Sequence, residues 1–459
     1  MSQRFDAIVI GTGQAGPSLA ARLVASGQSV AVVERHRFGG TCVNNGCTPT
    51  KALVASARAA YMARRGADFG VEIDGSIAVD MQKVKARKDA LVRRSTDGIE
   101  RWLKKLEGCT VFEGHARFEG PHTIRVGNAL LEGDKIFINV GARPFVPDLP
   151  GLDAVDYFTS SSIMGVDFLP EHLVIIGGSY IGLEFGQMYR RFGSEVTIIE
   201  MGPRLIRRDD EDVSEAVREM LEVEGINIRL DAECITLERK GNDVVVGVDC
   251  EAGDRQVVGS HVLLAVGRRP NTHDLGLEQT AVKVDDRGFV VVDDQLRTTQ
   301  PGVWALGDCN GQGAFTHTSY NDFEIVAANL LDDDPRRVSD RISCYGLYTD
   351  PPLGRAGMTE AQVRSSGRKA LVGKRAMTRI SRAVEKDETH GFMKFLIDAE
   401  SKEILGAAIL GVGGDEIIAS ILNVMYAKAP YTVVLRSVQV HPTVAELIPT
   451  TLDQLEPLS

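Results

Sequence analysis

Short apolar runs that stop at glycine are the clearest pattern in this chain. The first run covers residues 7–10, and a helix-compatible segment with apolar positions follows at residues 19–23. A second apolar run, at residues 29–33, stops at the acidic residue Glu34. The turn after the first run contains Gly11, Gly13 and Gly16. This order predicts a strand, a helix and a second strand of a parallel sheet, with a carboxylate at the end of the second strand.

The same order recurs about one domain later. An apolar run at residues 173–176 leads into a turn, then into a helix predicted to run through Tyr189, and then into residues 196–199, which stop at Glu200. The turn contains Gly177, Gly178 and Gly182, with Ser179 at the middle glycine position. One glycine fingerprint is a weak signal. Two copies, each with a strand, a helix and a terminal acid in order, predict two dinucleotide-binding units.

Other segments indicate how these units are joined and which unit comes after them. Residues 139–144 and 265–270 each follow an apolar strand and turn on a glycine, so they predict the returns from one nucleotide-binding unit to the other. Residues 303–308 predict a further strand that ends at a glycine and a carboxylate. In the C-terminal part, residues 391–410 predict a hairpin and residues 415–428 an amphipathic helix. This part is an α+β unit without a phosphate loop.

Charge and composition exclude several function classes. The net charge of −11 gives no general attraction to nucleic acid or to an anionic membrane, and no apolar run reaches the length of a membrane span. We interpret the basic run at residues 83–94 as a solvated helix face.

A strand begins almost at the N-terminus, which leaves no room for a signal peptide. Seven cysteines in 459 residues do not suit a secreted disulfide scaffold, so we expect a cytoplasmic protein.

Two cysteines five positions apart make residues 39–51 the strongest chemical signal in the chain. On a regular helix, residues five apart are separated by about 7.5 Å along the axis. A disulfide needs Cα atoms within about 7 Å. If Cys42 and Cys47 pair, the backbone between them is therefore distorted, and Gly46 permits the distortion. Lys51 lies one helical turn beyond Cys47, where its charge stabilises a thiolate. The segment predicts a redox-active cysteine pair.

The glycine turns predict where dinucleotides bind. The first turn lets the backbone wrap around a pyrophosphate at a helix N-terminus, while Glu34 accepts hydrogen bonds from ribose hydroxyls. Glu200 favours a free ribose 2′-hydroxyl and therefore NAD. Three arginines follow Glu200 and suit the 2′-phosphate of NADP instead: Arg204, Arg207 and Arg208. The sequence therefore leaves the choice between NADH and NADPH open, with NADH slightly favoured. Asp308 suits a helix N-cap, but its place after a further glycine-ended strand better fits a hydrogen bond to the ribityl chain or phosphate of a flavin nucleotide. We also expect cofactor contacts from Gly40, Thr41, Lys51, Gly141, Gly267 and Gly307.

A histidine near the C-terminus supplies acid–base chemistry. His441 titrates near neutrality and can move a proton for a thiol, and Glu446 can orient it. A His-Pro pair alone is more often a turn, but beside a redox cysteine pair the sequence favours catalysis. The remaining five cysteines lack the spacing of metal ligands, so we expect no metal site: Cys109, Cys234, Cys250, Cys309 and Cys344. Cys309 follows Asp308, and we interpret it as a small core thiol.

With these motifs in this order, essentially the whole chain resembles the FAD-dependent pyridine nucleotide–disulfide oxidoreductases. Dihydrolipoamide dehydrogenase, glutathione reductase and mercuric reductase belong to that family. The resemblance implies an α/β fold with two Rossmann-like domains, for FAD and NAD(P), and a C-terminal α+β dimerisation domain. The limits expected from it are 1–149 and 271–337 for an FAD domain split in sequence, 150–270 for the NAD(P) domain and 338–459 for the dimerisation domain.

The resemblance also implies a role for each residue near the flavin. Cys42 is expected to be the interchange thiol that meets the substrate, and Cys47 the thiol stacked on the flavin. Lys51 and Glu184 are expected to pair near the reactive flavin nitrogen. Tyr180 is expected to gate the nicotinamide pocket. Hydride then passes from NAD(P)H to FAD, the flavin reduces the disulfide, and the dithiol reduces an acceptor.

The family resemblance further implies a homodimer with shared active sites. His441, oriented by Glu446, is expected to come from the other subunit and to be the acid–base partner of Cys42. The isolated chain then holds two half-sites, and activity requires the dimer.

The acceptor is less clearly indicated. Around the cysteines the chain resembles mercuric reductases about as well as dihydrolipoamide dehydrogenase. Mercuric reductases carry a vicinal cysteine pair near the C-terminus and typically lack His-Pro-Thr-x-x-Glu, whereas here the last cysteine is Cys344 and the motif is intact. Dihydrolipoamide dehydrogenases differ at residues 44–45 and 48–50.

We favour a stand-alone disulfide or metal-ion reductase, with dihydrolipoamide dehydrogenase and mercuric or copper ion reductase as alternatives. A flavoprotein redox sensor with slow turnover, and direct quinone reduction by the flavin, are alternatives of other classes.

Overall fold

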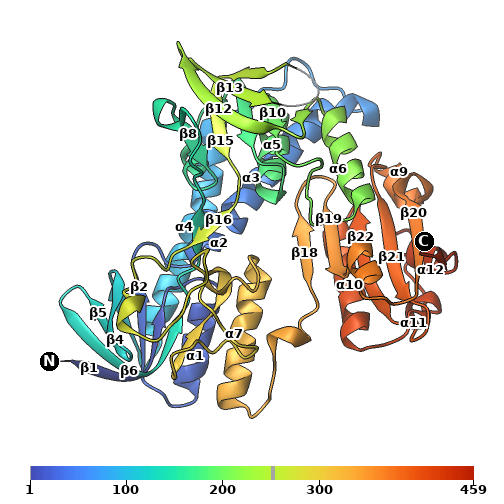
Figure 1. Cartoon of the computed structure of the whole chain (residues 1–459). Helices are drawn as coiled ribbons and strands as arrows, with labels where there is room; N and C mark the ends of the chain where they lie inside the picture. The colour runs from blue at the N-terminus through green and yellow to red at the C-terminus, as the bar shows by residue number, and fades with distance from the viewer. Residues whose placement is uncertain (1, 250–253, 459) are drawn as a thin grey trace.

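The computed structural model describes residues 2–249 and 254–458 and has a mixed α/β architecture in three units (Figure 1). An N-terminal and a middle unit are each built on a mostly parallel sheet with helices beside it, and the C-terminal unit on an antiparallel sheet. The two Rossmann-like units and the α+β unit expected from the sequence are therefore present. In the described part of the chain, no helix combines the length and the apolar character needed to cross a bilayer. Cys250 lies outside the described residues.

The N-terminal sheet combines strands from two distant parts of the sequence. Its strands are β1 (Gln3–Ile10), β2 (Val30–Glu34), β3 (Cys109–Glu113), β4 (Ala116–Gly120), β5 (Thr123–Val126), β6 (Ala129–Ile138) and β17 (Val303–Ala305). They follow the order β3-β2-β1-β6-β5-β4, and β17 also pairs with β6. The neighbours β3, β2, β1, β6 and β17 run parallel. The last strand therefore returns to the sheet that begins the chain, after the whole middle unit has been formed.

The middle unit repeats the parallel arrangement on a smaller scale. Its parallel strands are β8 (Tyr157–Thr159), β9 (His172–Ile176), β10 (Glu195–Ile199), β11 (Asn227–Arg229) and β15 (His261–Leu264), in the order β11-β10-β9-β15-β8. Helices α5 (Tyr180–Phe192) and α6 (Glu211–Val223) accompany them. A separate antiparallel sheet contains β12 (Glu233–Lys240), β13 (Asp243–Asp249) and β14 (Gln256–Gly259). Residues 173–176 are fully buried, as their unbroken apolar run predicts.

Two short strands join the N-terminal and middle units. β7 (Ala142–Pro144) and β16 (Arg268–Pro270) pair antiparallel, with Arg143 opposite Arg269. They belong to the two segments that the sequence predicts as returns between the units. The structure confirms this prediction, because the two crossings of the chain lie side by side.

The C-terminal unit is an antiparallel sheet beside short helices. Its strands are β18 (Cys344–Leu347), β19 (Leu353–Gly357), β20 (Ala370–Ala376), β21 (Phe392–Asp398), β22 (Ile404–Leu410) and β23 (Glu456–Pro457). Its helices are α8 (Glu360–Ser365), α9 (Ser381–Glu385), α10 (Gly414–Tyr426), α11 (Thr432–Leu435) and α12 (Leu447–Leu452). The predicted hairpin is β21 with β22, and the predicted amphipathic helix is α10.

The helices of the N-terminal unit position the cysteine pair. They are α1 (Ala15–Ala25), α2 (Gly40–Asn44), α3 (Cys47–Arg64), α4 (Met81–Lys105) and α7 (Thr316–Leu331). The basic run at residues 83–94 lies in α4, and most of its charges face solvent as expected. Lys88 is the exception, because only 4% of it is exposed and its ammonium donates to the Met164 carbonyl oxygen at 2.5 Å. The interpretation as a solvated face is therefore wrong at this one position, where α4 packs against the middle unit.

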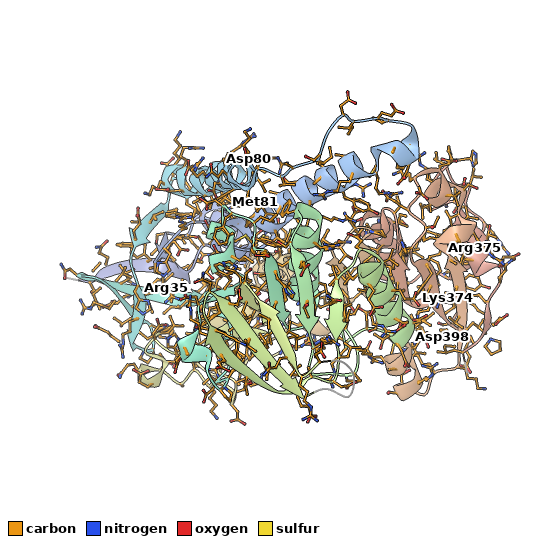
Figure 2. All side chains as sticks on the ribbon, turned by 90° about the horizontal axis from the view of Figure 1, so that it is seen from above. Arg35, Asp80, Met81, Lys374, Arg375 and Asp398 are labelled. Atoms are coloured by element: carbon orange, nitrogen blue, oxygen red, sulfur yellow. The ribbon has the colours of Figure 1, made fainter. Side chains whose placement is uncertain are left out.

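A buried ion cluster joins the middle unit to the C-terminal sheet. The Lys394 ammonium lies 3.0 Å from Asp210, 2.6 Å from Asp212 and 2.6 Å from Glu360. Lys374 also donates to Asp212, at the end of the molecule opposite Arg35 (Figure 2). Asp210 and Asp212 therefore neutralise lysine charge across the contact between the two units, and Glu360 does so from within the C-terminal unit.

Candidate active site

The cysteine pair lies at a break between two helices. Cys42 is in α2, Cys47 begins α3, and residues 45–46 interrupt the helical path between them. Gly46 has φ −117° and ψ −120°, and a Cβ there would lie 2.9 Å from the Thr41 carbonyl oxygen and 3.1 Å from the Cys42 Cα. The backbone distortion predicted from the spacing is present, and the close approach explains why a glycine stands at this position. Both cysteines are free thiols in this structure.

The surroundings of Cys47 favour its thiolate. Its pKa is lowered to about 6, chiefly by a hydrogen bond from Cys42 and further by Thr316 and the charge of Lys51. The Thr316 hydroxyl is hydrogen-bonded to the Cys47 sulfur at 3.2 Å. Cys47 is the first residue of α3 and Thr316 the first of α7, so the positive ends of two helix dipoles meet at this sulfur. The hydrogen bond to Cys47, with burial, raises the pKa of Cys42.

An ion pair lies behind the cysteine pair. The Lys51 ammonium donates to Glu184 Oε2 at 2.5 Å, and the other oxygen of Glu184 accepts from the Tyr348 backbone N–H at 2.9 Å. Lys51 Nζ also lies 4.2 Å from the centre of the Tyr348 ring. The expected contact between Lys51 and Glu184 is therefore present. Tyr348 was missed by sequence reasoning, because no local pattern connects it to a lysine almost 300 positions earlier.

The first glycine turn has the geometry of a dinucleotide loop. Gly11 has φ +102°, which favours glycine, and a Cβ on Gly16 would lie 2.3 Å from the Gly11 carbonyl oxygen. Glu34 accepts from both the Thr12 backbone N–H, at 3.0 Å, and the Thr12 hydroxyl, at 2.6 Å. The carboxylate therefore stands directly at the turn, and it retains acceptor capacity for a further hydroxyl. Gly13 lies close to Gly40, whose Cβ would lie 2.8 Å from the Gly13 Cα.

The second glycine turn repeats this geometry. A Cβ on Gly182 would lie 2.0 Å from the Gly177 carbonyl oxygen. Glu200 accepts from the Gly178 backbone N–H at 2.7 Å and from the Gly202 backbone N–H at 2.8 Å. The carboxylate thus lies at the turn, as expected. The three arginines behind Glu200 are partly or fully exposed: Arg204, Arg207 and Arg208.

The remaining predicted cofactor residues surround the junction of β7 and β16. Arg268 donates to the Ala142 carbonyl oxygen, and its guanidinium lies 3.4 Å from the Thr41 hydroxyl and 3.5 Å from Asp308. Burial raises the pKa of Asp308. Arg268 was missed by sequence reasoning, although its place in a glycine-arginine turn was a usable signal. Gly307 has φ +72°, and its backbone N–H donates to a buried aspartate, Asp322, at 2.8 Å.

Open space accompanies two of these glycines. Gly141 has φ +62° and Gly267 has φ +126°, and a Cβ built on either would meet no atom within 4 Å. Each of the two glycine turns lies at a helix N-terminus and has a carboxylate beside it, which suits a dinucleotide. The open space beside Gly141 and the buried Asp308 suit a flavin, so one turn fits a flavin dinucleotide and the other a nicotinamide dinucleotide. The residues present therefore fit both cofactors.

Tyr180 follows the second glycine turn, and Cys309 follows Gly307 and Asp308 after β17. Tyr180 begins α5 directly after the second glycine turn, and burial raises its pKa to about 12. Cys309 is fully buried, and its thiol donates to the Leu306 carbonyl oxygen at 3.2 Å. The interpretation of Cys309 as a small core thiol agrees with this placement.

The C-terminal histidine is preoriented but lies away from the cysteines of its own chain. His441 Nδ1 is 2.8 Å from Glu446 Oε2, and 78% of the histidine side chain is exposed. Figure 1 shows α11 and α12, which flank His441 in sequence, at the lower right of the molecule, away from α2 near its middle. Among the contacts of the described residues, none joins His441 to Cys42 or Cys47. A single chain therefore does not assemble these groups into one site.

Models of two protein families match this chain. The model described as "Pyridine nucleotide-disulphide oxidoreductase" matches residues 5–322. The model described as "Pyridine nucleotide-disulphide oxidoreductase, dimerisation domain" matches residues 344–452. The first range covers most of the N-terminal and middle units, and the second covers most of the C-terminal unit.

Several relatives are similar to this chain along nearly their whole length. The probable pyridine nucleotide-disulfide oxidoreductase RclA of Escherichia coli is 35% identical over 451 residues, covering 96% of this chain and 97% of the relative. A dihydrolipoyl dehydrogenase of Thermus scotoductus is 33% identical over 448 residues, covering 96% and 95%. A mercuric reductase of Streptomyces lividans is 32% identical over 450 residues, covering 97% and 94%.

The solved structures agree with these sequence relationships. The HOCl-induced flavoprotein disulfide reductase RclA from Escherichia coli matches with a TM-score of 0.89 and 34% identity, covering 98% of this chain and 99% of that structure. The two family models, the full-length relatives and the paired glycine turns lead to one assignment. The chain belongs to the pyridine nucleotide–disulphide oxidoreductases and is an FAD-dependent oxidoreductase that uses NAD(P)H.

Proposed function

We propose that this protein is a reductase that passes electrons from NAD(P)H through a Cys42–Cys47 redox pair to a disulfide or metal-ion acceptor. The observation that carries this proposal is the environment of Cys47. Its sulfur lies at the first turn of two helices and is hydrogen-bonded to Thr316, and its pKa is lowered to about 6 mainly by the hydrogen bond from Cys42. A thiol that is ionised at neutral pH beside a second thiol is suited to dithiol–disulfide exchange.

The two cysteines have different roles in the proposed reaction. Bound FAD supplies the conversion of a hydride from NAD(P)H into two electrons for a disulfide. When the Cys42–Cys47 bond takes up these electrons, it breaks, Cys42 takes a proton and Cys47 keeps the negative charge. Lys51, paired with Glu184, stabilises that charge. Cys42 is then the thiol that meets the acceptor.

For a disulfide acceptor, the remaining steps are two thiol exchanges. Cys42 gives its proton to a base, attacks one acceptor sulfur, and the released thiolate takes that proton. Cys47 then attacks Cys42, the Cys42–Cys47 bond reforms, and the second acceptor thiolate takes a proton from water. One NAD(P)H and one proton reduce one disulfide to two thiols. With Cu(II), the same two electrons reduce two ions to Cu(I), the Cys42–Cys47 bond reforms, and the single proton of the Cys42 thiol is released.

We assign the base to His441 of the partner subunit in a homodimer with shared active sites. The support is the exposed ring of His441, its contact with Glu446 at 2.8 Å, and the family model for a dimerisation domain over residues 344–452. A histidine held through Nδ1 by a carboxylate presents its other nitrogen to a thiol.

The proposed domain limits follow the same scheme: 1–149 and 271–337 for FAD, 150–270 for NAD(P) and 338–459 for dimerisation.

We propose NADH as the preferred nucleotide. Glu200 stands at the second glycine turn, where a carboxylate accepts from the 2′-hydroxyl of NADH and repels the 2′-phosphate of NADPH. The neighbouring arginines Arg204, Arg207 and Arg208 are partly or fully exposed, and the 2′-phosphate of NADPH is the group that they would attract. Comparison of kcat/KM for NADH and NADPH tests this preference.

Copper ion reduction is the second candidate activity. One solved structure of the relative RclA is a Cu(II) complex, which is 33% identical to this chain with a TM-score of 0.89. A thiol pair of this kind binds and reduces soft or borderline metal ions. Dihydrolipoamide and mercuric ion reduction are alternatives because relatives with those names match at 33% and 32% identity.

A panel of acceptors tests the proposed function. Wild-type protein and the Cys42→Ser variant are assayed with NADH and NADPH against oxidised lipoamide, glutathione disulfide, Hg(II) and Cu(II). The proposal expects turnover with at least one acceptor that is lost in the variant. Rapid flavin reduction in stopped-flow experiments without turnover on any acceptor supports the slow redox sensor instead. Quinone reduction that survives loss of both thiols supports direct transfer from the flavin.

A further inference from the structure

An aromatic cluster separates the second glycine turn from the cysteine pair. Tyr180 directly follows that turn, and its ring lies edge-on to Phe315, at 5.9 Å and 81°. It also lies edge-on to Tyr345, at 5.5 Å and 72°. Phe315 immediately precedes Thr316, whose hydroxyl is hydrogen-bonded to the Cys47 sulfur. A nicotinamide ring that travels from the glycine turn toward the cysteines therefore meets these three aromatic side chains first.

Tyr345 is the fixed member of this cluster. It lies in β18 of the C-terminal unit, and its ring stacks on Phe315 with centres 5.6 Å apart and planes 11° apart. Its hydroxyl donates to Asp209 Oδ2 at 2.8 Å. One ring face and the polar end are therefore both held. Because Tyr180 rests against Tyr345, this fixation extends to Tyr180.

Asp209 is an unusual partner for a tyrosine. It lies two residues before α6 with its side chain fully buried, and its second oxygen, Oδ1, has no hydrogen-bond partner among the described residues. The nearest charge is Arg355, whose Nε is 3.9 Å from that oxygen and is itself buried without a hydrogen bond. Burial raises the pKa of Asp209 and, together with Asp209, that of Tyr345.

A buried carboxylate with an unsatisfied oxygen costs stability, so its retention needs a physical reason. Asp210 lies close to two buried cations, 3.0 Å from Lys394 Nζ and 2.9 Å from Arg355 Nη1, whereas Asp209 has only the 3.9 Å approach of Arg355 Nε. The hydrogen bond to Tyr345 is the one polar contact that Asp209 makes with the aromatic cluster. This contact with Tyr345 therefore gives a physical reason for a buried carboxylate at position 209.

We infer that Tyr345 and Asp209 are positioning residues that hold Tyr180 closed over the nicotinamide site in the nucleotide-free protein. This inference rests on the proposed function, because it takes the second glycine turn as the nicotinamide nucleotide site. Nucleotide binding has to move Tyr180 out of its contacts with Tyr345 and Phe315. The contacts made only in the closed arrangement reduce the apparent nucleotide affinity, by the ordinary linkage between two conformations.

The test uses the oxidised holoprotein and NAD⁺, which binds without transferring a hydride. Calorimetric titration gives the Kd of the wild type and of Tyr345→Phe, which keeps the stacked ring and loses the hydroxyl. We expect Tyr345→Phe to lower the Kd for NAD⁺ by up to about tenfold, because a ring without its hydrogen bond to Asp209 holds Tyr180 less firmly in the closed arrangement. The matched control is Tyr320→Phe in α7, whose ring packs on Phe323 with centres 5.1 Å apart and is 44% exposed. Its Kd is expected to equal that of the wild type.

A double-variant comparison separates positioning from a general structural effect. If Tyr345 acts through Tyr180, the change in Kd caused by Tyr345→Phe disappears in a Tyr180→Ala background. Asp209→Asn, whose amide oxygen still accepts the hydrogen bond, is expected to change the Kd less than Tyr345→Phe does. The thermal midpoints of the variants show whether each protein is folded.

The outcomes are distinct from those that test the proposed function. An unchanged or increased Kd in folded Tyr345→Phe overturns the inference, as does an equal effect in the Tyr180→Ala background. If the wild type shows no measurable binding of NAD⁺ or NADP⁺, the assignment of the second glycine turn as the nicotinamide nucleotide site is wrong, which is a failure of the proposed function. Activity through Cys42 and Cys47 does not enter this measurement.

Discussion

The sulfur of Cys47 and the hydroxyl of Thr316 lie 3.2 Å apart, although 269 positions separate them in the sequence. Each is the first residue of its helix, α3 or α7. The contact therefore brings two helix N-termini and a hydroxyl to one sulfur, and each of these favours a negative charge there. The proposed division of labour between the two cysteines depends on this arrangement.

The first prediction concerns Cys42. Cys42→Ser removes the sulfur that meets the acceptor, so NAD(P)H-dependent reduction of disulfides is expected to fall by about a thousandfold or more. Flavin content is expected to stay at the wild-type level, because the glycine turns that would hold the dinucleotide are unchanged. Both quantities are measured on the same preparation, by turnover and by the flavin-to-protein ratio. Disulfide reduction at the wild-type rate in this variant contradicts the mechanism.

The pH dependence of Cys47 gives the second prediction. The pKa of Cys47 is about 6, so its rate of alkylation by iodoacetamide in the reduced protein is expected to rise with a midpoint near pH 6. Because the pKa is lower in the folded than in the unfolded protein, the thiolate stabilises the reduced fold fully above the ordinary thiol pKa. This contribution is lost as the pH falls through about 6. Peptide mapping by mass spectrometry assigns the label to Cys47.

A matched pair of variants connects that midpoint to Thr316. Thr316→Val keeps the shape and removes the hydroxyl, so the midpoint is expected to rise by about one pH unit. Thr432→Val changes the first residue of α11 in the same way and is expected to leave the midpoint unchanged. A midpoint near 8 to 9 already in the wild type, the range of an ordinary thiol, contradicts the proposed environment of Cys47.

The third prediction uses the separation of His441 from the cysteines of its own chain. Neither Cys42→Ser nor His441→Ala homodimers are expected to reduce disulfides at an appreciable rate. After mixed refolding or coexpression, half of the dimers are heterodimers, and each of these has one intact site. Activity of about a quarter of the wild-type value is therefore expected for equal amounts of the two chains. If verified heterodimers show no disulfide reductase activity, that result contradicts a site shared between the two subunits.

The fourth prediction concerns the nucleotide. Glu200→Ala removes the carboxylate at the second glycine turn, so kcat/KM for NADH is expected to fall by about tenfold, while the value for NADPH falls less or rises. Glu195→Ala, at the exposed start of β10, the strand that ends just before Glu200, is the control and is expected to change neither value. Equal losses with both nucleotides show that Glu200 does not discriminate between them.

The sequence predicts well the features that depend on contiguous residues. Both glycine turns, the helix break at Gly46 and the hairpin of β21 and β22 follow from local periodicity and from backbone geometry that few residue types allow. The contact of Lys51 with Glu184 was expected only because the chain resembles a known family. No property of either residue identifies the other across 133 positions.

Other parts of the site could not be predicted from local patterns. Thr316, Tyr345 and Tyr348 become site residues because three units of the fold meet there, and each lies in an ordinary segment of the sequence. Lys88 was expected in solvent, since a basic run usually faces water, yet it supplies a hydrogen bond between α4 and the middle unit. Such contacts depend on how helices and sheets pack over long sequence separations.

Anaerobic titration of the holoprotein with NADH, followed by its visible spectrum, tests the central claim most directly. The account predicts that a long-wavelength absorption band appears at the two-electron stage, because a Cys47 thiolate then lies against the oxidised flavin. It also predicts that the band is lost in Cys47→Ser and that NADH is a better donor than NADPH. Bleaching of the flavin without that band would contradict the account, because the cysteine pair would then lie outside the path of the electrons.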